Sequence, residues 1–411
     1  MPATNRLTAF AHVTEQQVED LAFLWLLWDR AAHQPDQTAA TRAKLERRMN
    51  AHLNGLAVSP DIAWARALET EETCDAGELF VLAMLALERG DPASLARVVA
   101  LSQAQPHARR GLVSALGWQN SARVYPLLKP WIASDNPYER YLAVAACSVR
   151  RLDPQAYLQR LLRDPANREQ PDLYARLLRL VGELKRTDLV AELRPAMAEE
   201  GEPAFWAHWS ALMLGESRAC AGLAPFVLDP EATQRRAIDL AFRASPANQA
   251  WDWINQLVNS GQDGAVVRAL GALGDPRGVN WLLTRMEEPE LAKQAAEAFT
   301  LITGVDLEAA QLTQLSPPAA PEPDVMAVTD YEHRPYPAPE KALRYWGGIR
   351  HRFTPGQRYL MGVPVADAPL QAIWRDGLQP QRRAAAIEWA LSSPQAPYPN
   401  LNAPVGTGGG L

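Results

Sequence analysis

The sequence has few of the residue patterns that reveal chemistry. Its 411 residues include only three cysteines, Cys74, Cys147 and Cys220, whose spacing is not that of a disulfide framework or a zinc site. It contains no Gly-rich phosphate loop ending in Gly-Lys-Ser/Thr, no His-Glu-x-x-His motif, no nucleophile elbow and no EF-hand loop. We therefore expect no metal and no cofactor, although these absences leave open a catalytic site assembled from distant residues.

The sequence also lacks an apolar run long enough to cross a bilayer. The most apolar early run, LAFLWLLW at 21–28, is short, whereas a membrane helix needs about 20 apolar residues. The first residues do not have the pattern of a signal peptide. With so few cysteines, these features predict a cytoplasmic protein with no membrane span.

Acidic residues outnumber basic residues before residue 331. The net charge is -6 for the whole chain, which divides into -10 for residues 1–330 and +4 for residues 331–411. An acidic surface repels phosphate backbones unless one face is locally basic, so nucleic acid is not an expected partner.

The sequence is rich in one pattern, a repeat of about 30 residues. In ALGALGDPRGVNWLL, at 269–283, a helix rich in small residues ends at Gly-Asp-Pro and a second helix begins at once. Neither helix of such a pair could bury its apolar stripe alone, so an all-α, HEAT-like α-solenoid, or α-α superhelix, is predicted. The residue that anchors the repeat recurs in steps of 30, 30, 35, 30, 29, 30 and 29 at Leu87, Gly117, Cys147, Gly182, Leu212, Ala241, Gly271 and Thr300.

Four segments follow from this pattern. Residues 1–69 form a helical N-terminal cap, 70–311 the repeat array, 312–330 a Pro-rich linker, and 331–411 a basic, aromatic, partly irregular C-terminal segment that ends in a disordered tail, GTGGGL. In the cap we expect helices over 15–32, where Thr14 and Gln17 make a capping pattern, and over 36–56, with Arg42, Lys44, Arg47 and Arg48 largely outside the apolar stripe. In the C-terminal segment we expect helices over 340–350 and 381–391, and RYLMGVPV is expected to be either a strand or an extended strip that lies on the array.

Several stretches also resemble sequences of known repeat proteins. GALGDPRGVNWLL resembles HEAT-type repeats. Four further stretches are similar to one family of bacterial HEAT-repeat proteins, often encoded beside type VI secretion spike and effector genes: FWAHWSALMLGESRA (205–219), EAFTLITGVDL (297–307), FTPGQRYLMGVPV (353–365) and QRRAAAIEWAL (381–391). The resemblance covers residues from about 12 to 400. It implies an accessory role in type VI secretion, as an adaptor or chaperone that receives an effector, and it supplies no catalytic residues.

Candidate binding residues come from the concave face expected for the second helices, from the tryptophans and from the basic aromatic segment. For each there is a structural alternative: a solvated helix face, an aromatic that fills a gap between helices, or an arginine or tyrosine that ties the C-terminal segment to the acidic array. The candidates are Arg123, Asp188, Glu192, Trp206, Asn280, Arg285, Tyr345, Trp346, Arg358 and Tyr359.

The sequence thus favours a non-enzymatic scaffold that binds a protein partner, such as a type VI effector or spike protein. One alternative is a HEAT-fold enzyme, either a DNA glycosylase, which needs a catalytic acid facing a basic groove, or a tetrapyrrole lyase, which binds a chromophore. A second alternative is an immunity or regulatory protein that covers the site of a toxin.

Overall fold

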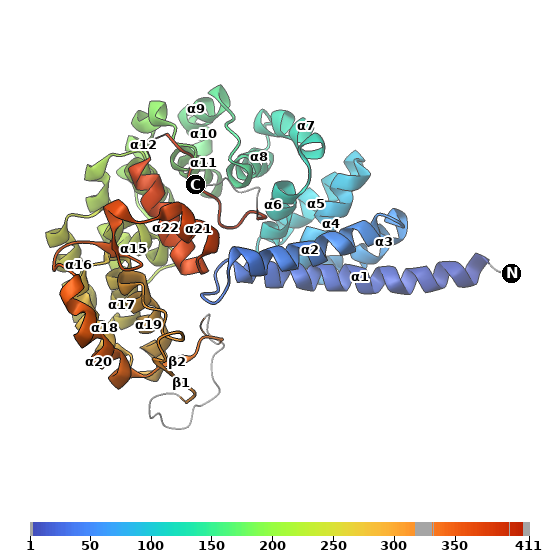
Figure 1. Ribbon diagram of the computed structural model, residues 1–411. Coiled ribbons are helices and arrows are strands. Elements are labelled where there is room, and N and C mark those ends of the chain that lie inside the picture. The colour runs from blue at the N-terminus through green and yellow to red at the C-terminus, as the bar shows by residue number, and fades with distance from the viewer. Residues whose placement is uncertain (1–2, 317–330, 332, 394, 406–411) are drawn as a thin grey trace. The chain divides into compact units, whose positions relative to one another are not determined.

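The computed structural model describes residues 3–316, 331, 333–393 and 395–405 (Figure 1). In this part of the chain the protein is all-α, its helices pack in sequential pairs consistent with an α-α superhelix, and strands are few and short. The predicted fold class is confirmed. No helix of the described part is at once long and apolar enough to span a membrane.

Contacts divide the chain into two compact units. Among the described residues, the first contains those up to 33, 37–180 and 399–405, and the second contains 34–36 and 181–398.

The eight residues that anchor the repeat lie near the C-terminal ends of eight first helices. In the first unit α4 packs on α6 and α6 on α8, and in the second α13, α15, α17 and α19 pack in the same successive way. The periodicity therefore marks equivalent helices. The first helices are α4 (Ala76–Arg89), α6 (Arg109–Trp118), α8 (Pro137–Arg150), α11 (Pro171–Glu183), α13 (Gly201–Met213), α15 (Gln234–Ala244), α17 (Asp263–Leu273) and α19 (Pro289–Thr303).

Three of the second helices begin with a 3-10 turn. They are α5 (Pro92–Ala104), α7 (Ser121–Ile132), α9 (Ala156–Arg163) with α10 (Pro165–Arg168), η2 (Thr187–Leu189) with α12 (Val190–Met197), η3 (Ser217–Leu223) with α14 (Ala224–Leu228), α16 (Ala247–Asn259), and η4 (Pro276–Gly278) with α18 (Val279–Arg285).

Glycine and aspartate at the breaks explain the tight connections. Gly90 and Gly274 end α4 and α17 with φ values of 69° and 72°, a left-handed conformation that glycine adopts without strain. Asp91 then caps the next helix by accepting a hydrogen bond from the Ser94 backbone amide at 2.8 Å.

The N-terminal helices are α1 (Ala3–Ala31), α2 (Ala39–Leu56) and α3 (Pro60–Ala67), followed by η1 (Leu68–Thr73). The predicted start of the first helix at Glu15 was wrong, because helix already runs through the residues before Thr14 and the side chain of Thr14 is buried. No proline or glycine interrupts residues 3–13, so the capping pattern at Thr14 has no chain end to cap. A side-chain cap is present instead at the start of α2, where the hydroxyl of Thr38 accepts a hydrogen bond from the Thr41 amide at 3.1 Å.

Arg42 departs most clearly from the prediction for α2. It was expected outside the apolar stripe, yet it is only 1% exposed. Its guanidinium lies 4.5 Å from the centroid of the Trp28 ring and donates to the carbonyl oxygen of Leu401 at 2.6 Å. Glu46, one turn along the helix, accepts from the Val405 amide. Residues 399–405 therefore cover a face of α2 that would otherwise be solvated.

The C-terminal segment continues the array before it folds back. The strand β1 (Thr313–Gln314) pairs antiparallel with β2 (Tyr336–Pro337). The helix α20 (Pro339–Ile349), which lies within one residue of the predicted range at each end, packs on α18. In Figure 1 the helix α20 follows α16 and α18 along the outer row of the second unit, so it takes the place of a second helix after α19. Most of the predicted linker, 317–330, and the tail GTGGGL lie outside the described residues.

After α20 come η5 (Arg350–Arg352), a hairpin of β3 (Tyr359–Leu360) and β4 (Val363–Pro364), η6 (Val365–Asp367), α21 (Leu370–Asp376) and α22 (Gln379–Ser392). The last helix was predicted and α21 was not. The helix α22 packs on α13 and α15, and Lys185 joins it to α13 by donating to the carbonyl oxygens of Met213 and Ala390.

The strip around β3 forms hydrogen bonds with carbonyl groups at the C-terminal ends of the first helices. The last carbonyl groups of a helix have no partner within that helix. Here the amide of Tyr359 donates to the Gly274 carbonyl at 2.8 Å, and the amides of Met361 and Gly362 donate to the carbonyls of Leu301 and Ile302 near the end of α19. The two alternatives predicted for RYLMGVPV were a strand and an extended strip on the array, and the structure has features of both, because the stretch forms β3 and β4 and lies on the ends of α17 and α19.

Close helix packing at small residues gives a first test. A Cβ atom at Gly111 of α6 would lie 2.0 Å from the carbonyl oxygen of Ala76 and 2.7 Å from the backbone nitrogen of Phe80 in α4. We expect Gly111→Ala to destabilise the first unit by about 1–3 kcal/mol, because the two helices must separate. The thermal unfolding midpoint measures this.

The matched control is Gly264→Ala in α17, where the nearest atom to a Cβ is 3.7 Å away. It should leave the midpoint unchanged or raise it, because alanine favours helix more than glycine does. An unchanged midpoint for Gly111→Ala would contradict the close contact between α4 and α6.

Candidate functional site

The ten predicted binding residues do not form one site. Arg123 lies in the first unit on α7, where its guanidinium pairs with Glu88 at 3.0 Å. The other nine lie in the second unit. Asp188, in η2, pairs with Arg186 at 2.7 Å, and the hydrogen bond from that guanidinium holds the pKa of the Asp188 carboxyl below its usual range. Glu192 is half-buried on α12.

Three of the predicted aromatic residues are buried. Trp206 packs edge-on against Phe205 and Trp209, and its indole nitrogen donates to Glu202 at 2.9 Å. Trp346 and Tyr359 both pack on the ring of Phe353. These side chains fill space between helices, so in this conformation they offer no surface to a partner.

Polar candidates on α18 are bonded within the chain. The Asn280 side-chain oxygen accepts from the Trp346 indole at 3.1 Å, which fixes α20 against α18. Arg285 pairs with Asp263 at 3.1 Å and lies 4.8 Å from the centroid of the Trp281 ring. Asn280 and Trp346 are thus the two candidates that the fold brings directly together.

Arg358 is the candidate with the most bonds. Its guanidinium donates to the carbonyl oxygens of Leu273 at 3.1 Å and Arg243 at 2.7 Å, at the C-terminal ends of α17 and α15. It also pairs with the buried carboxylate of Glu388 on α22. A cation is favourable at a helix C-terminus, where carbonyl dipoles converge. Arg358 therefore joins two first helices to the last helix, as the alternative of a tied C-terminal segment predicted.

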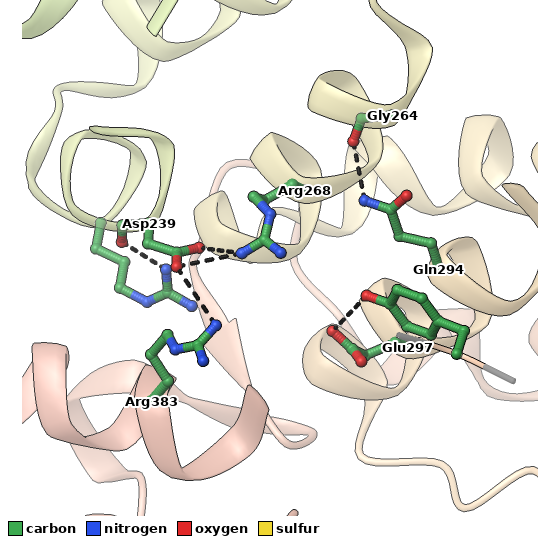
Figure 2. Close-up of polar contacts among 8 residues, drawn as sticks. Asp239, Gly264, Arg268, Gln294, Glu297 and Arg383 are labelled. Carbon is green, nitrogen blue, oxygen red and sulfur yellow. Dashed lines mark hydrogen bonds and ion pairs between the residues drawn. The ribbon is translucent and has the colours of Figure 1, made fainter. Parts of the chain in front are cut away.

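A row of charged residues at equivalent repeat positions was missed by the sequence analysis. Asp239, Arg268 and Glu297 are each 29 residues apart, on the successive helices α15, α17 and α19. Figure 2 shows these three side chains with Arg383 of α22, which comes within 4.0 Å of Asp239. We refer to Asp239, Arg268 and Glu297 as the charge row. Its sequence signal is charge of alternating sign at one position of the repeat.

The two ends of the charge row are in different electrostatic states. Burial opposes ionisation of Asp239, but the charges of Arg268, Arg383 and Arg243 outweigh it and lower the pKa of that carboxyl. Arg268 bonds it directly, at 3.0 and 3.2 Å. Asp239 and Arg268 thus form an ion pair whose two side chains are largely buried.

Glu297 is the unusual member. Burial raises the pKa of its carboxyl to about 7, because the positive charges of Arg268, Arg383 and Arg334 and a hydrogen bond from the Tyr331 hydroxyl, drawn in Figure 2, only partly offset it. The second carboxyl oxygen has no hydrogen-bond partner and no contact with solvent. A pKa near neutrality suits a general acid or base, but a catalytic group must also be within hydrogen-bond distance of a substrate.

A cavity of about 460 Å³ lies elsewhere in the second unit, between the end of α19 and α20. Tyr345 and Ile349 line it from α20, Phe353 from the loop after η5, and its charged groups are Asp306 and Arg352. Tyr345 is thus the candidate that lines a cavity, and Glu297 does not line it.

No group of three histidine, cysteine, aspartate or glutamate side chains that could hold a metal ion occurs within the part of the chain that the structure describes. Comparison with protein-family models, with curated proteins and with solved structures gives no match for this chain. The family resemblance therefore rests on the quoted stretches alone.

Arg358 gives a stability prediction. Arg358→Gln removes the cation that donates to two carbonyl oxygens. It leaves Glu388, whose side chain is 7% exposed, with Arg243 at 3.6 Å as its remaining ion-pair partner among the described residues. We expect a loss of about 2–4 kcal/mol, since a buried carboxylate loses its closest partner. Thermal unfolding measures it, with Arg375→Gln as the control, because the Arg375–Asp376 pair is exposed and screened by solvent, so its loss should leave the midpoint nearly unchanged. Equal effects of the two variants would contradict the role of Arg358.

Glu297 gives a pH-dependent prediction. Its folded-state pKa of about 7 is above the value near 4.3 of an unfolded chain, so the folded protein binds this proton more tightly. The contribution of this group to stability therefore falls as the pH rises through that window. Glu297→Gln mimics the protonated form, so we expect it to be more stable than the wild type by about 1–3 kcal/mol at pH 8.

That advantage should shrink towards zero as the pH is lowered to 4.5. The measurement is the unfolding midpoint of both proteins across this range, with Glu290→Gln, an exposed residue of the same helix, as the control. If Glu297→Gln is less stable than the wild type at pH 8, attraction to Arg268 outweighs burial and the assignment is wrong.

Proposed function

We propose that the protein is a non-enzymatic scaffold that binds another protein, and that it acts as an adaptor or effector chaperone in type VI secretion. The observation that supports binding is the stacked array of helix pairs, an architecture whose extended surfaces commonly hold partners. Support for the secretion role is the resemblance of the four quoted stretches.

The contacts within the chain narrow down the surface that would bind. Trp206, Trp346, Arg358 and Tyr359 are occupied by intramolecular contacts, whereas Tyr345 is 39% exposed on α20. A partner would be held by such exposed aromatic and charged side chains on the outer helices, with an apolar centre and a polar rim. This mechanism uses no cofactor.

One observation favours an enzyme as a second candidate. Glu297 combines a pKa near neutrality with neighbouring arginines, which suits a general acid, although its carboxyl is buried and does not line the cavity described above. Incubation of the protein with alkylated duplex DNA tests this. Release of a base that Glu297→Gln abolishes would favour the enzyme, and no release by the wild type would remove it.

The scaffold is tested by its partner. The tagged full-length protein is expressed in its native host and purified at two salt concentrations, and the proteins that co-purify are identified by mass spectrometry. We expect a spike or effector protein in stoichiometric amount, which is retained at the higher salt if apolar contacts dominate.

Nucleic acid, or no specific protein, would contradict the scaffold. If the bound protein is a toxin that loses its activity in the complex, the immunity role replaces the chaperone role, because the two share the binding physics and differ in this outcome.

A further inference from the structure

The outer side of α20 and η5 carries positive charge that the described part of the chain does not neutralise. Residues 339–352 have a net charge of +3 in a chain whose net charge is -6. In the described residues, no ion pair or hydrogen bond joins the guanidinium of Arg344, Arg350 or Arg352 to another group. By contrast, Arg285 and Arg358 are both paired with carboxylates.

Two glycines lie beside these arginines at positions where no close packing within the described residues requires a glycine. At Gly347 and Gly348 a Cβ atom would meet nothing within 4 Å. At Gly274, in contrast, a Cβ atom would lie 2.3 Å from the Tyr359 carbonyl oxygen. Glycine is the least favourable residue in a helix interior after proline, so its use on an open helix face has a cost. The close approach of another backbone is a contact that glycine permits and larger residues block.

Apolar side chains border the glycines. Leu343, one turn before Gly347 on the same face, is 56% exposed. Tyr345 is also exposed, and with Ile349 it lines the cavity of about 460 Å³ on the adjoining side of α20. The helix thus presents apolar, glycine and basic positions together.

We propose that this surface binds an acidic segment of a partner protein. We define it as the α20 surface, formed by Lys341, Leu343, Arg344, Gly347, Gly348 and Arg350. Carboxylates of the partner would pair with Arg344 and Arg350, since guanidinium and carboxylate groups form two parallel hydrogen bonds, and the partner backbone would lie over the two glycines. The exposed leucine and the glycines favour a polypeptide, and the net negative charge of the chain disfavours a phosphate backbone. This inference rests on the proposed function and deepens it.

A crosslinking experiment tests the surface in the full-length protein. The photoreactive residue benzoylphenylalanine replaces Tyr345, the protein is expressed and irradiated in its native host, and the crosslinked peptides are sequenced by mass spectrometry. We expect a partner peptide with an excess of aspartate and glutamate. The double variant Arg344→Glu/Arg350→Glu should lower the crosslink yield about tenfold, because attraction becomes repulsion.

Two further variants separate charge from shape. The control Arg194→Glu/Arg218→Glu makes the same change at two exposed arginines of the second unit and should leave the yield within about twofold of the wild type. Gly347→Leu keeps the charge and adds a side chain where the structure leaves open space. It should lower the yield while the unfolding midpoint stays unchanged or rises.

Four outcomes would overturn the α20 surface: no crosslink, a crosslink to nucleic acid, a crosslinked peptide without acidic excess, or a yield that charge reversal does not change. The purification described above separates the two proposals. If the partner co-purifies with Arg344→Glu/Arg350→Glu as well as with the wild type, the scaffold stands and the α20 surface is wrong. If no specific protein co-purifies with the wild type, both fail.

Discussion

The unpaired carbonyl groups at the C-terminal ends of the first helices are the constraint on which the rest of the structure depends. A stack of helix pairs places many such ends along one edge, and none can be bonded within its own helix. In the second unit, backbone amides of the β3–β4 hairpin and the guanidinium of Arg358 donate hydrogen bonds to carbonyl oxygens at the ends of α15, α17 and α19. The Tyr398 amide donates to the carbonyl oxygen of Glu183 in α11. In the first unit the side-chain amide of Asn400 donates a hydrogen bond to the carbonyl oxygen of Val149 in α8. The C-terminal segment is therefore part of the fold of both units.

The charge row follows from the same periodicity. A repeat returns one position to the same place on each successive helix, so charges of one sign there would repel one another, and alternating charges attract. Asp239 and Arg268 satisfy each other, whereas Glu297 ends the row with a hydroxyl partner on one oxygen and none on the other. The unfavourable burial of one carboxylate is thus a local consequence of where the array ends.

These internal contacts change how candidate residues are interpreted. Residue type directed attention to Trp346, Arg358 and Tyr359, which the chain uses for its own packing. Arginines of the same segment that pair with nothing in the described residues, such as Arg344 and Arg350, differ in their surroundings and not in their chemistry. A binding surface is therefore identified by what the fold leaves unpaired.

The sequence by itself determined the repeat and the helices, because amphipathic spacing and helix breaks are local features with a fixed period. The eight repeat anchors and the approximate ranges of α20 and α22 could be predicted from it. Only the tertiary structure decided that α1 extends back to Ala3, that Arg42 is buried, and that Arg358 joins α15, α17 and α22. Arg42 bonds a residue 359 positions away and Arg358 one 115 positions away. Such contacts follow from how the chain returns on itself, and no local pattern encodes that.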